Sequence, residues 1–423
     1  MSAPVSFGGI GQAFRSRNFT IFWWGQLNLS IAAWVFRLAL AWIVWELTQS
    51  TAWLGIVAAA QMLPILLLCP IGGVTADRWG AQRQLVWACA ATGATGLALA
   101  VMAATGTLTI AWVLVLSVLN GATRAFTIPP RQAIVPSLVE PHLLPAVLGF
   151  QSATYYGANF IGPAIGGFLI ATFGVGAALG YFAFGAAIAV VTLPFLKLPA
   201  RVPRLGAPTG FAADLVEGFR YTARHPGIRL MILYVGLIAL CMQPVVDMLA
   251  SVADNVLVMG PQGLAMLAST FGCGAMAGGL WIAWRGRTDG LIRILLGCVA
   301  AGLIAQLLFA ASGSLWLSMP ALFAIGVTVV ITNTATSSLI QNTVDPNLRA
   351  RVMAFDSMLS VGAPSVGAVL IGWAGSYFGI QAPLAVAAVV GLAIVTLSQS
   401  HVRSEMANLE TGRLTADLRQ PAE

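Results

Sequence analysis

Twelve long and mostly apolar stretches run through the chain, and they limit its fold more than any other feature. Inside a bilayer only helices and closed β-barrels satisfy their own backbone hydrogen bonds, and a crossing helix needs about 20 apolar residues. A barrel would instead show short strands of alternating polarity. We therefore predict an all-α integral membrane protein with twelve transmembrane helices. The expected spans are residues 19–46, 51–76, 84–104, 107–127, 150–172, 176–196, 228–252, 262–284, 291–311, 315–337, 353–375 and 381–399.

Charged residues are scarce and lie mainly on one side of these spans. They make up 8% of the chain, and hydrophobic residues make up 58%, whereas a soluble domain carries about a quarter charged residues. If the N-terminus is cytoplasmic, 20 of the 21 Lys and Arg residues fall toward the cytoplasmic ends, and Arg37 is the exception. This bias predicts a multi-pass membrane protein with both termini in the cytoplasm. It also explains the net charge of +7 without a nucleic-acid partner.

A repeated segment shows how the spans are organised. Residues 139–174 and 344–379 align without a gap at an offset of 205, and twelve of the 36 aligned pairs are identical. Six spans lie between the copies, and an even number returns the chain to the same side, so we predict two parallel six-helix repeats. In the first copy the identical residues are Val139, Pro141, Leu143, Val147, Phe150, Ser152, Gly157, Ala158, Gly162, Gly167, Phe173 and Gly174.

The repeat and the local composition divide the chain into four regions. A linker that contains proline, glycine and arginine joins the two halves, and residues 211–224 within it are expected to form an amphipathic helix on the membrane surface. The C-terminal segment is polar and mixed in charge. The predicted regions are a six-helix bundle at 1–198, a cytoplasmic linker at 199–226, a second six-helix bundle at 227–400 and a cytoplasmic tail at 401–423.

The sharpest local motif is GGVTADRWGAQR, between the second and third spans. Its glycines permit close helix packing and a tight turn. Its aspartate can face the positive N-terminus of a neighbouring helix, and its two arginines lie at the inner membrane boundary. We predict a gating loop whose functional residues are Gly73, Asp77, Arg78, Gly80 and Arg83.

Four further segments accompany this motif: WIVWELT at 42–48, PPRQA at 129–133, VPSLV at 135–139 and GPAIGG at 162–167. Together they resemble the major facilitator superfamily of transporters. Within it they resemble the bacterial branch of enterobactin-exporter-like and macrolide-efflux-like proteins. The resemblance covers about residues 15–395 and implies two six-helix bundles that alternate access to a central site.

The GPAIGG segment resembles the core of the helix-5 antiporter motif of that superfamily. A proline removes a backbone donor, and glycines allow close packing at the interface between bundles. The predicted residues of this kink are Gly162, Pro163, Gly166 and Gly167. The sequence departs from the family's pattern at two arginines. The proton-linked arginine of the fourth helix is not evident, since Arg124 lies nearer the inner end. Many relatives carry a second arginine a few residues before the Gly-Pro pair, and this chain has Asn159 there.

Two charges lie well inside predicted spans, where a charged side chain is costly and therefore marks a functional site. Arg37 belongs to a helical stripe of the first span with Gln26, Ser30 and Trp34. Asp247 belongs to a similar stripe of the seventh span. These spans are repeat partners, and in the fold that the sequence resembles they face each other across the central cavity, so we expect Arg37 and Asp247 to approach each other or a shared substrate. The alternatives are that Arg37 extends outward to the membrane surface or that local polar partners neutralise each charge.

A third candidate is Asp356, at the inner start of the eleventh span, where the other repeat carries Gln151. A carboxyl group in a low-dielectric setting can carry a proton, although a helix-start acid can also simply face the cytoplasm. Other polar and aromatic residues could line a central cavity. The candidates for substrate binding or coupling are Arg37, Asp247, Asp356, Trp34, Gln61, Gln151, Tyr155, Asn159 and Gln243, and Asn120, Tyr156 and Asn333 are further cavity candidates.

The sequence contains no motif that indicates a cofactor or an enzymatic reaction. It has no GxxxxGK[ST] loop for a nucleotide, no grouped cysteines and histidines for a metal, and no catalytic triad. Taken with these absences, the resemblance implies a monomeric secondary transporter of the bacterial inner membrane, surrounded by lipid, that exports an amphipathic small molecule such as a drug or siderophore by proton antiport. The alternatives are a lysophospholipid flippase or importer of the same fold, and a non-transporting membrane sensor or assembly factor.

Overall fold

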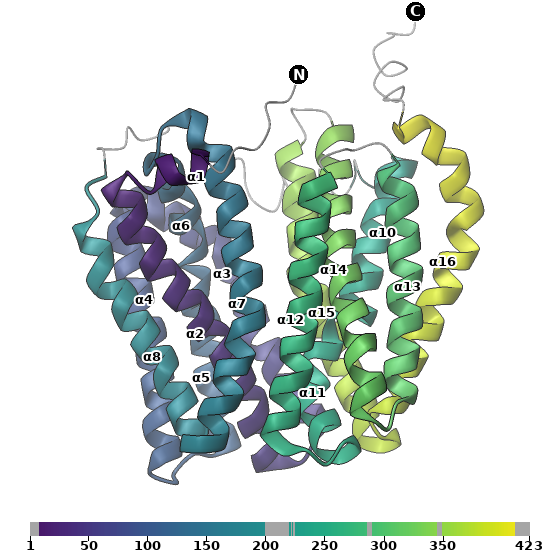
Figure 1. Cartoon of the computed structure of the whole chain (residues 1–423), viewed down its shortest axis with the longest axis horizontal. Helices are drawn as coiled ribbons and strands as arrows, with labels where there is room; N and C mark the ends of the chain where they lie inside the picture. The colour runs from purple at the N-terminus through teal and green to yellow at the C-terminus, as the bar shows by residue number, and fades with distance from the viewer. Residues whose placement is uncertain are drawn as a thin grey trace, which may run out of the picture.

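The computed structural model describes residues 8–198, 220, 222, 225–285, 290–344 and 349–410. Its helices include twelve spans that are long and apolar enough to cross a membrane, as predicted, and the described ranges contain no strand. Two bundles stand side by side (Figure 1). The predicted amphipathic helix at 211–224 lies outside the described residues except for two positions.

The N-terminal bundle begins with a short helix and contains six spans, some of which end in short 3-10 helices. Its elements are α1 (Gly8–Ala13), α2 (Arg17–Thr48), α3 (Thr51–Trp79), α4 (Ala81–Ala104), α5 (Ile110–Ala125), α6 (Ile128–Ile134), η1 (Val135–Ser137), η2 (Pro141–Leu143), α7 (Leu144–Phe173), α8 (Val175–Thr192) and η3 (Leu193–Phe195).

The C-terminal bundle also supplies six spans, and its last helix extends past the predicted bundle boundary at residue 400. Its elements are α10 (Pro226–Cys241), η4 (Gln243–Met248), α11 (Leu249–Ser251), η5 (Val252–Val256), α12 (Gly260–Arg285), α13 (Leu291–Ala311), α14 (Leu315–Thr343), α15 (Arg349–Phe378) and α16 (Gln381–Glu410).

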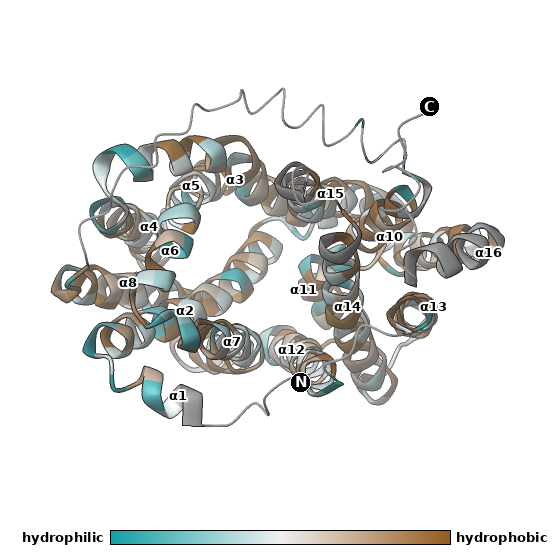
Figure 2. Cartoon of the chain, turned by 90° about the horizontal axis from the view of Figure 1, so that it is seen from above, coloured by the Kyte–Doolittle hydropathy of each residue, from teal (hydrophilic) through white to brown (hydrophobic). Residues whose placement is uncertain are grey.

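Both α1 and the C-terminal part of α16 lie at the same end of the molecule, which we name the terminal face (Figure 1). The other end, where α2 finishes and α3 begins, is the opposite face. Large apolar side chains are exposed around the perimeter, and polar ones such as Asn120 and Gln306 are buried inside the bundles. Seen from above, most turns of the spanning helices have the colours of hydrophobic residues (Figure 2). This distribution suits a protein surrounded by lipid.

The repeated segment folds into two helices with matching bounds. Both ends of α7 and α15 differ by the same 205 positions as the sequence repeat. Gly174 and Gly379, which follow them, have φ angles of +81° and +75°, a backbone region that favours glycine. The parallel duplication predicted from the sequence is therefore present in the backbone.

The same repeat sets how the bundles pack together. The most extensive contacts between bundles join α7 to α12 and α15 to α3. A Cβ atom added at Gly162 would meet α2, and one at the equivalent Gly367 would meet α10 and η4. Likewise Gly167 packs on α12 and its equivalent Gly372 packs on α3. Small residues at matching positions thus let corresponding helices approach in both halves.

The first and seventh spans break this symmetry. The helix α2 is continuous, but α10 ends at Cys241 and gives way to the 3-10 helix η4 and the π-helix η5. Pro244 explains the break, because proline has no N–H and disfavours helical geometry in the residue before it. The span predicted at residues 228–252 is present, but it is not one continuous α-helix, so the prediction of a simple helical stripe through Asp247 is wrong.

Candidate functional site

A cavity of about 340 Å³ lies between the two bundles. The broken seventh span and α15 line it from the C-terminal half, and α2, α3, α4, α5, α6, α7 and α8 line it from the other half. Its lining residues are Leu29, Ser30, Ala33, Trp34, Phe36, Arg37, Ala58, Gln61, Met62, Cys89, Thr92, Asn120, Arg124, Thr127, Arg131, Tyr155, Phe182, Gln243, Asp247, Ser360, Val361, Pro364 and Ser365.

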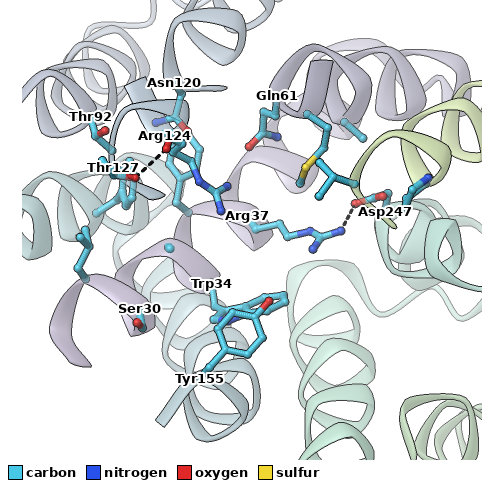
Figure 3. A pocket seen from close by; sticks show the side chains of 18 of the residues that line it. Ser30, Trp34, Arg37, Gln61, Thr92, Asn120, Arg124, Thr127, Tyr155 and Asp247 are labelled. Carbon is cyan, nitrogen blue, oxygen red and sulfur yellow. Dashed lines mark hydrogen bonds and ion pairs between the residues drawn. The ribbon is translucent and has the colours of Figure 1, made fainter. Parts of the chain in front are cut away.

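An ion pair crosses this cavity from one bundle to the other. Arg37 Nη2 on α2 donates to Asp247 Oδ1 on η4 at 2.6 Å (Figure 3). The Arg37 side chain is 34% exposed and that of Asp247 is 15% exposed, so both groups are accessible from the cavity. The structure thus brings together the two charges that the sequence placed on repeat-partner spans.

Aromatic side chains lie beside this pair. The Arg37 guanidinium carbon is 5.5 Å from the centroid of the Trp34 ring, within the range of a cation–π contact. Trp34 in turn packs edge to face against Tyr155 of α7, with ring centroids 5.8 Å apart. Tyr155 is 52% exposed. Together these residues form an aromatic surface beside the charges (Figure 3).

Two arginines that belong to the basic residues expected toward the cytoplasmic side also face the cavity. Arg124 lies at the end of α5 and Arg131 on α6. The close-up shows the guanidinium of Arg124 directed into the space that Arg37 also enters (Figure 3). A sequence signal was present, because Ser117, Asn120 and Arg124 recur at helical steps of three and four residues, which places them on one face.

Hydrogen bonds between α4 and α5 support the cationic side of the cavity. Asn120 Nδ2 donates to Thr95 Oγ1 at 3.0 Å, and the hydroxyls of Thr92 and Thr123 are 2.9 Å apart. Thr127 donates to the backbone oxygen of Arg124 at 2.8 Å and closes the end of α5. These bonds restrain the helix turns that carry Arg124.

The remaining predicted cavity residues divide into two groups. Gln61 and Gln243 line the cavity, as do Trp34, Tyr155 and Asn120. Four other predicted residues are absent from this lining among the described residues. For Asn159 the reason is helix packing, because its backbone packs against Gly272 on α12. For these four residues the prediction of a cavity-lining position is wrong: Gln151, Tyr156, Asn159 and Asn333.

Asp356 also lies outside the cavity lining. Its side chain is 4% exposed, and its Oδ1 atom is buried without a hydrogen-bond partner in the part of the chain that the structure describes. The alternative of a helix-start acid that faces the cytoplasm is therefore wrong. Ser360, one helical turn further along α15, does line the cavity.

The predicted gating loop is mostly helical. The motif from Gly73 to Arg78 occupies the last turns of α3, and Gly80 alone links α3 to α4 with a φ angle of +89°. Gly72 packs closely on α5, whereas a Cβ at Gly73 would meet only Pro129, at 4.0 Å. The close helix packing that was expected at Gly73 therefore occurs at Gly72.

These residues lie at the terminal face, away from the ion pair. Arg78 and Arg83 line a separate cavity with exposed Trp79 and Trp87. The expected function of the motif as a gate stays a prediction.

The predicted kink region packs against two helices. The helix α7 runs without interruption through Pro163. Gly162 and Gly166 pack on α2 within the same bundle, and Gly167 packs on α12 of the other bundle. The region therefore connects the helix that carries Arg37 to the interface between bundles.

Hydrogen bonds join the bundles near the opposite face. Trp45 Nε1 donates to Asp254 Oδ2 at 2.8 Å, and Thr51 Oγ1 donates to the backbone oxygen of Gly372 at 2.7 Å. Trp45 is almost fully buried. Both bonds lie near the ends of α2 and α3 that form the opposite face, and the cavity lies between them and the terminal face.

Comparison with known proteins identifies a family match and several transporters as relatives. The family described as "Transmembrane secretion effector" matches residues 11–419. Macrolide efflux protein A of Streptococcus pyogenes is 21% identical over 84% of this chain and 88% of its own length. The multidrug efflux pump Tap of Mycobacterium tuberculosis is 29% identical over 43% of this chain and 45% of its own length.

Two solved structures show the same fold. The nucleoside transporter NupG has a TM-score of 0.64 and 15% identity, and the match covers 88% of this chain and 98% of NupG. A variant of the peptide transporter POT has a TM-score of 0.73 and 13% identity, and the match covers 93% of this chain and 95% of POT.

A further sequence relative is the staphyloferrin A transporter of Staphylococcus aureus. It is 29% identical over 34% of this chain and 37% of its own length.

Proposed function

The chain belongs to the transmembrane secretion effector family of the major facilitator superfamily, and we propose that it exports an amphipathic small molecule by alternating access. The family consists of transporters, and the relatives include efflux proteins for macrolides and other drugs and a staphyloferrin A transporter. The observation that carries the proposal is the ion pair between Arg37 and Asp247, which joins the two bundles across a cavity lined by both.

Alternating access needs two states with the cavity open to different sides. In the present state the hydrogen bonds of Trp45 and Thr51 join the bundles near the opposite face. With the terminal face in the cytoplasm of a bacterial inner-membrane protein, as the basic residues predict, this is the inward-facing state. In the outward-facing state the end of α3 and the arginines after it would close the cytoplasmic side.

Proton antiport would supply the energy for export. In this proposal the Arg37–Asp247 pair forms in the inward-facing state and separates in the outward-facing state, where the carboxyl group takes up a proton from outside. The proton is then released inward when the pair forms again. Asp356, buried in α15 without a partner for Oδ1 among the described residues, is a second acid that could carry this proton.

The test is transport in proteoliposomes with an imposed pH gradient. Asp247→Asn keeps the shape of the side chain and removes its charge, so we expect ΔpH-driven export of a fluorescent amphiphile to fall at least about fivefold, with exchange retained. Glu46→Gln is the matched control, because Glu46 lies on α2 near the opposite face and outside the central cavity. Full ΔpH-driven export by Asp247→Asn would remove this residue from the coupling mechanism.

The same liposomes separate the alternatives. A lysophospholipid added to one leaflet tests the flippase activity, and reversing the gradient tests import. If the protein moved no solute under any gradient and a partner protein co-purified in a fixed ratio, the non-transporting function would replace the proposed one.

A further inference from the structure

The cavity has an excess of positive charge that the ion pair does not balance. Arg37, Arg124 and Arg131 line it, and among the described residues Asp247 is the one acidic residue in its lining. Asp247 bonds to Arg37. In the part of the chain that the structure describes, Arg124 and Arg131 form no ion pair with an acidic side chain. Cations in a membrane-embedded cavity are unfavourable unless an anion or a polar partner compensates them.

We propose that the transported molecule is a small aromatic acid whose anionic group binds Arg124 and Arg131. This inference rests on the proposed transport function and names its substrate class. A guanidinium presents five N–H donors in a plane and binds carboxylate, sulfonate or phosphate oxygens in pairs. The Nη1 atom of Arg131 donates to Gln26 Oε1 at 3.5 Å. This bond is long, and it leaves the other N–H donors of the guanidinium available to an anion.

The arginines lie at different depths. Gln26, the partner of Arg131, and Arg37 lie on the same helix, and eleven residues separate them, which corresponds to about 16 Å at the helical rise. Arg124 lies in the last turn of α5, Arg131 lies on the following helix α6, and Arg131 is the more exposed of the two. An anion can therefore pass from the mouth at Arg131 to Arg124 without breaking the Arg37–Asp247 pair.

The rest of the cavity fits an apolar aromatic body. The edge-to-face pair of Trp34 and Tyr155 lies next to the arginines, and Leu29, Met62 and Phe182 add apolar surface. A cavity of about 340 Å³ is near the lower end of the usual range for ligand sites. A compact aromatic acid fits these features better than a large neutral or cationic drug.

An anionic substrate also has a consequence for energetics. The inside-negative membrane potential drives anions outward. One proton moving in and one monoanion moving out together carry two positive charges inward. Export should therefore respond more strongly to membrane potential than electroneutral exchange would.

The binding test uses three probes of one shape and different charge: 2-naphthoate, 2-naphthamide and 2-naphthylmethylammonium. Calorimetry on the full-length protein in detergent should show naphthoate binding at least about tenfold more tightly than the other two, and Arg124→Gln should weaken naphthoate about tenfold. Arg131→Gln should weaken it as well. Arg293→Gln is the control, because Arg293 lies on the peripheral helix α13, outside the cavity lining.

Three results would overturn the proposal: equal binding of the probes, tightest binding of the ammonium probe, or no measurable binding of naphthoate. Octyl phosphate that binds tenfold more tightly than naphthoate would assign the site to a lipid-type anion and overturn the aromatic assignment. Arg124→Lys, which keeps the charge, should retain part of the affinity and serves as the second variant if Arg124→Gln does not fold.

Transport of the same probes separates the two proposals. If proteoliposomes move naphthamide and the ammonium probe as fast as naphthoate, the transport function stands and the anion assignment fails. If naphthoate binds through Arg124 but no probe moves under any gradient, the anion site stands and the transport function fails.

Discussion

The helices α7 and α15 share a backbone plan and differ in chemistry. Their bounds match at a constant offset, and both are followed by a glycine with positive φ. Their equivalent glycines pack on equivalent helices. However, the equivalent cavity positions differ, because α7 carries the aromatic Tyr155 where α15 carries Ser360. Likewise, α7 carries Gln151 where α15 carries the buried Asp356.

The same contrast extends to the two bundles. The N-terminal bundle contributes the three arginines and the aromatic pair to the cavity, and the C-terminal bundle contributes Asp247 and hydroxyl groups. The repeated positions therefore form the packing surfaces between helices, and the positions that differ carry the charge. Helices in both halves meet through matching small residues, whereas the cationic and acidic groups of the cavity come from different halves.

The largest effect should come from disturbing a repeated glycine. Gly372→Val places side-chain atoms against the backbone carbonyl of Thr51, and overpacking of this kind costs about 1–3 kcal/mol. In the proposed alternating-access cycle this contact holds the opposite face closed, so a cost of about 2 kcal/mol should shift the equilibrium roughly thirtyfold toward the state open at that face.

Spin labels at Gly106 and Gly313 would measure this shift in protein lacking its native cysteines. They lie in the α4–α5 and α13–α14 turns, one on each bundle at the opposite face. Gly157→Val on α7 is the control, because a Cβ there would meet nothing within 4 Å. An unchanged label distance in Gly372→Val would show that the repeated glycine does not hold the bundles together.

A smaller effect should follow from removing the acid that only α15 carries. Asp356→Asn should lower ΔpH-driven export about tenfold, within the range of typical coupling free energies, because the buried carboxyl group can no longer take up a proton. Transport assays and thermal unfolding of the same preparation would measure this. Gln151→Glu at the equivalent position of α7 should leave export within about twofold. Equal losses in both variants would contradict a role specific to the C-terminal half.

The smallest effect should come from the hydrogen bond that joins the bundles near the opposite face. Trp45→Phe removes the bond to Asp254, which contributes about 1 kcal/mol. The population open at the opposite face should rise about fivefold, as measured by the same spin labels. Trp316→Phe, at a residue that is 90% exposed, should change nothing. A shift equal to that of Gly372→Val would show that this bond, and not glycine packing, dominates closure.

Much of the fold could be predicted from the sequence because its causes are local. Apolar length determines which segments cross the bilayer, and the gapless repeat predicted two parallel bundles. Even the approach of Arg37 to Asp247 followed as a hypothesis from the pairing of repeat-related spans, and the structure places them 2.6 Å apart.

The site was less predictable because it depends on which way each helix faces after packing. Arg124 and Arg131 obey the positive-inside rule as well as any surface arginine does, and only the packing of α5 and α6 turns them into the cavity. The break of the seventh span at Pro244 was visible in the sequence, but its effect on the direction of Asp247 was not.

The sequence by itself determined the membrane location, the number of spans and their duplication, because these follow from hydropathy and from identities along the chain. The sequence led us to expect that Arg37 and Asp247 approach each other, but only the tertiary structure decided that they touch and which other charges are unpaired or buried among the described residues. That decision depends on distances of a few ångströms between residues far apart in sequence, such as the pair 37 and 247. Hydropathy and spacing along one helix carry no information about such distances.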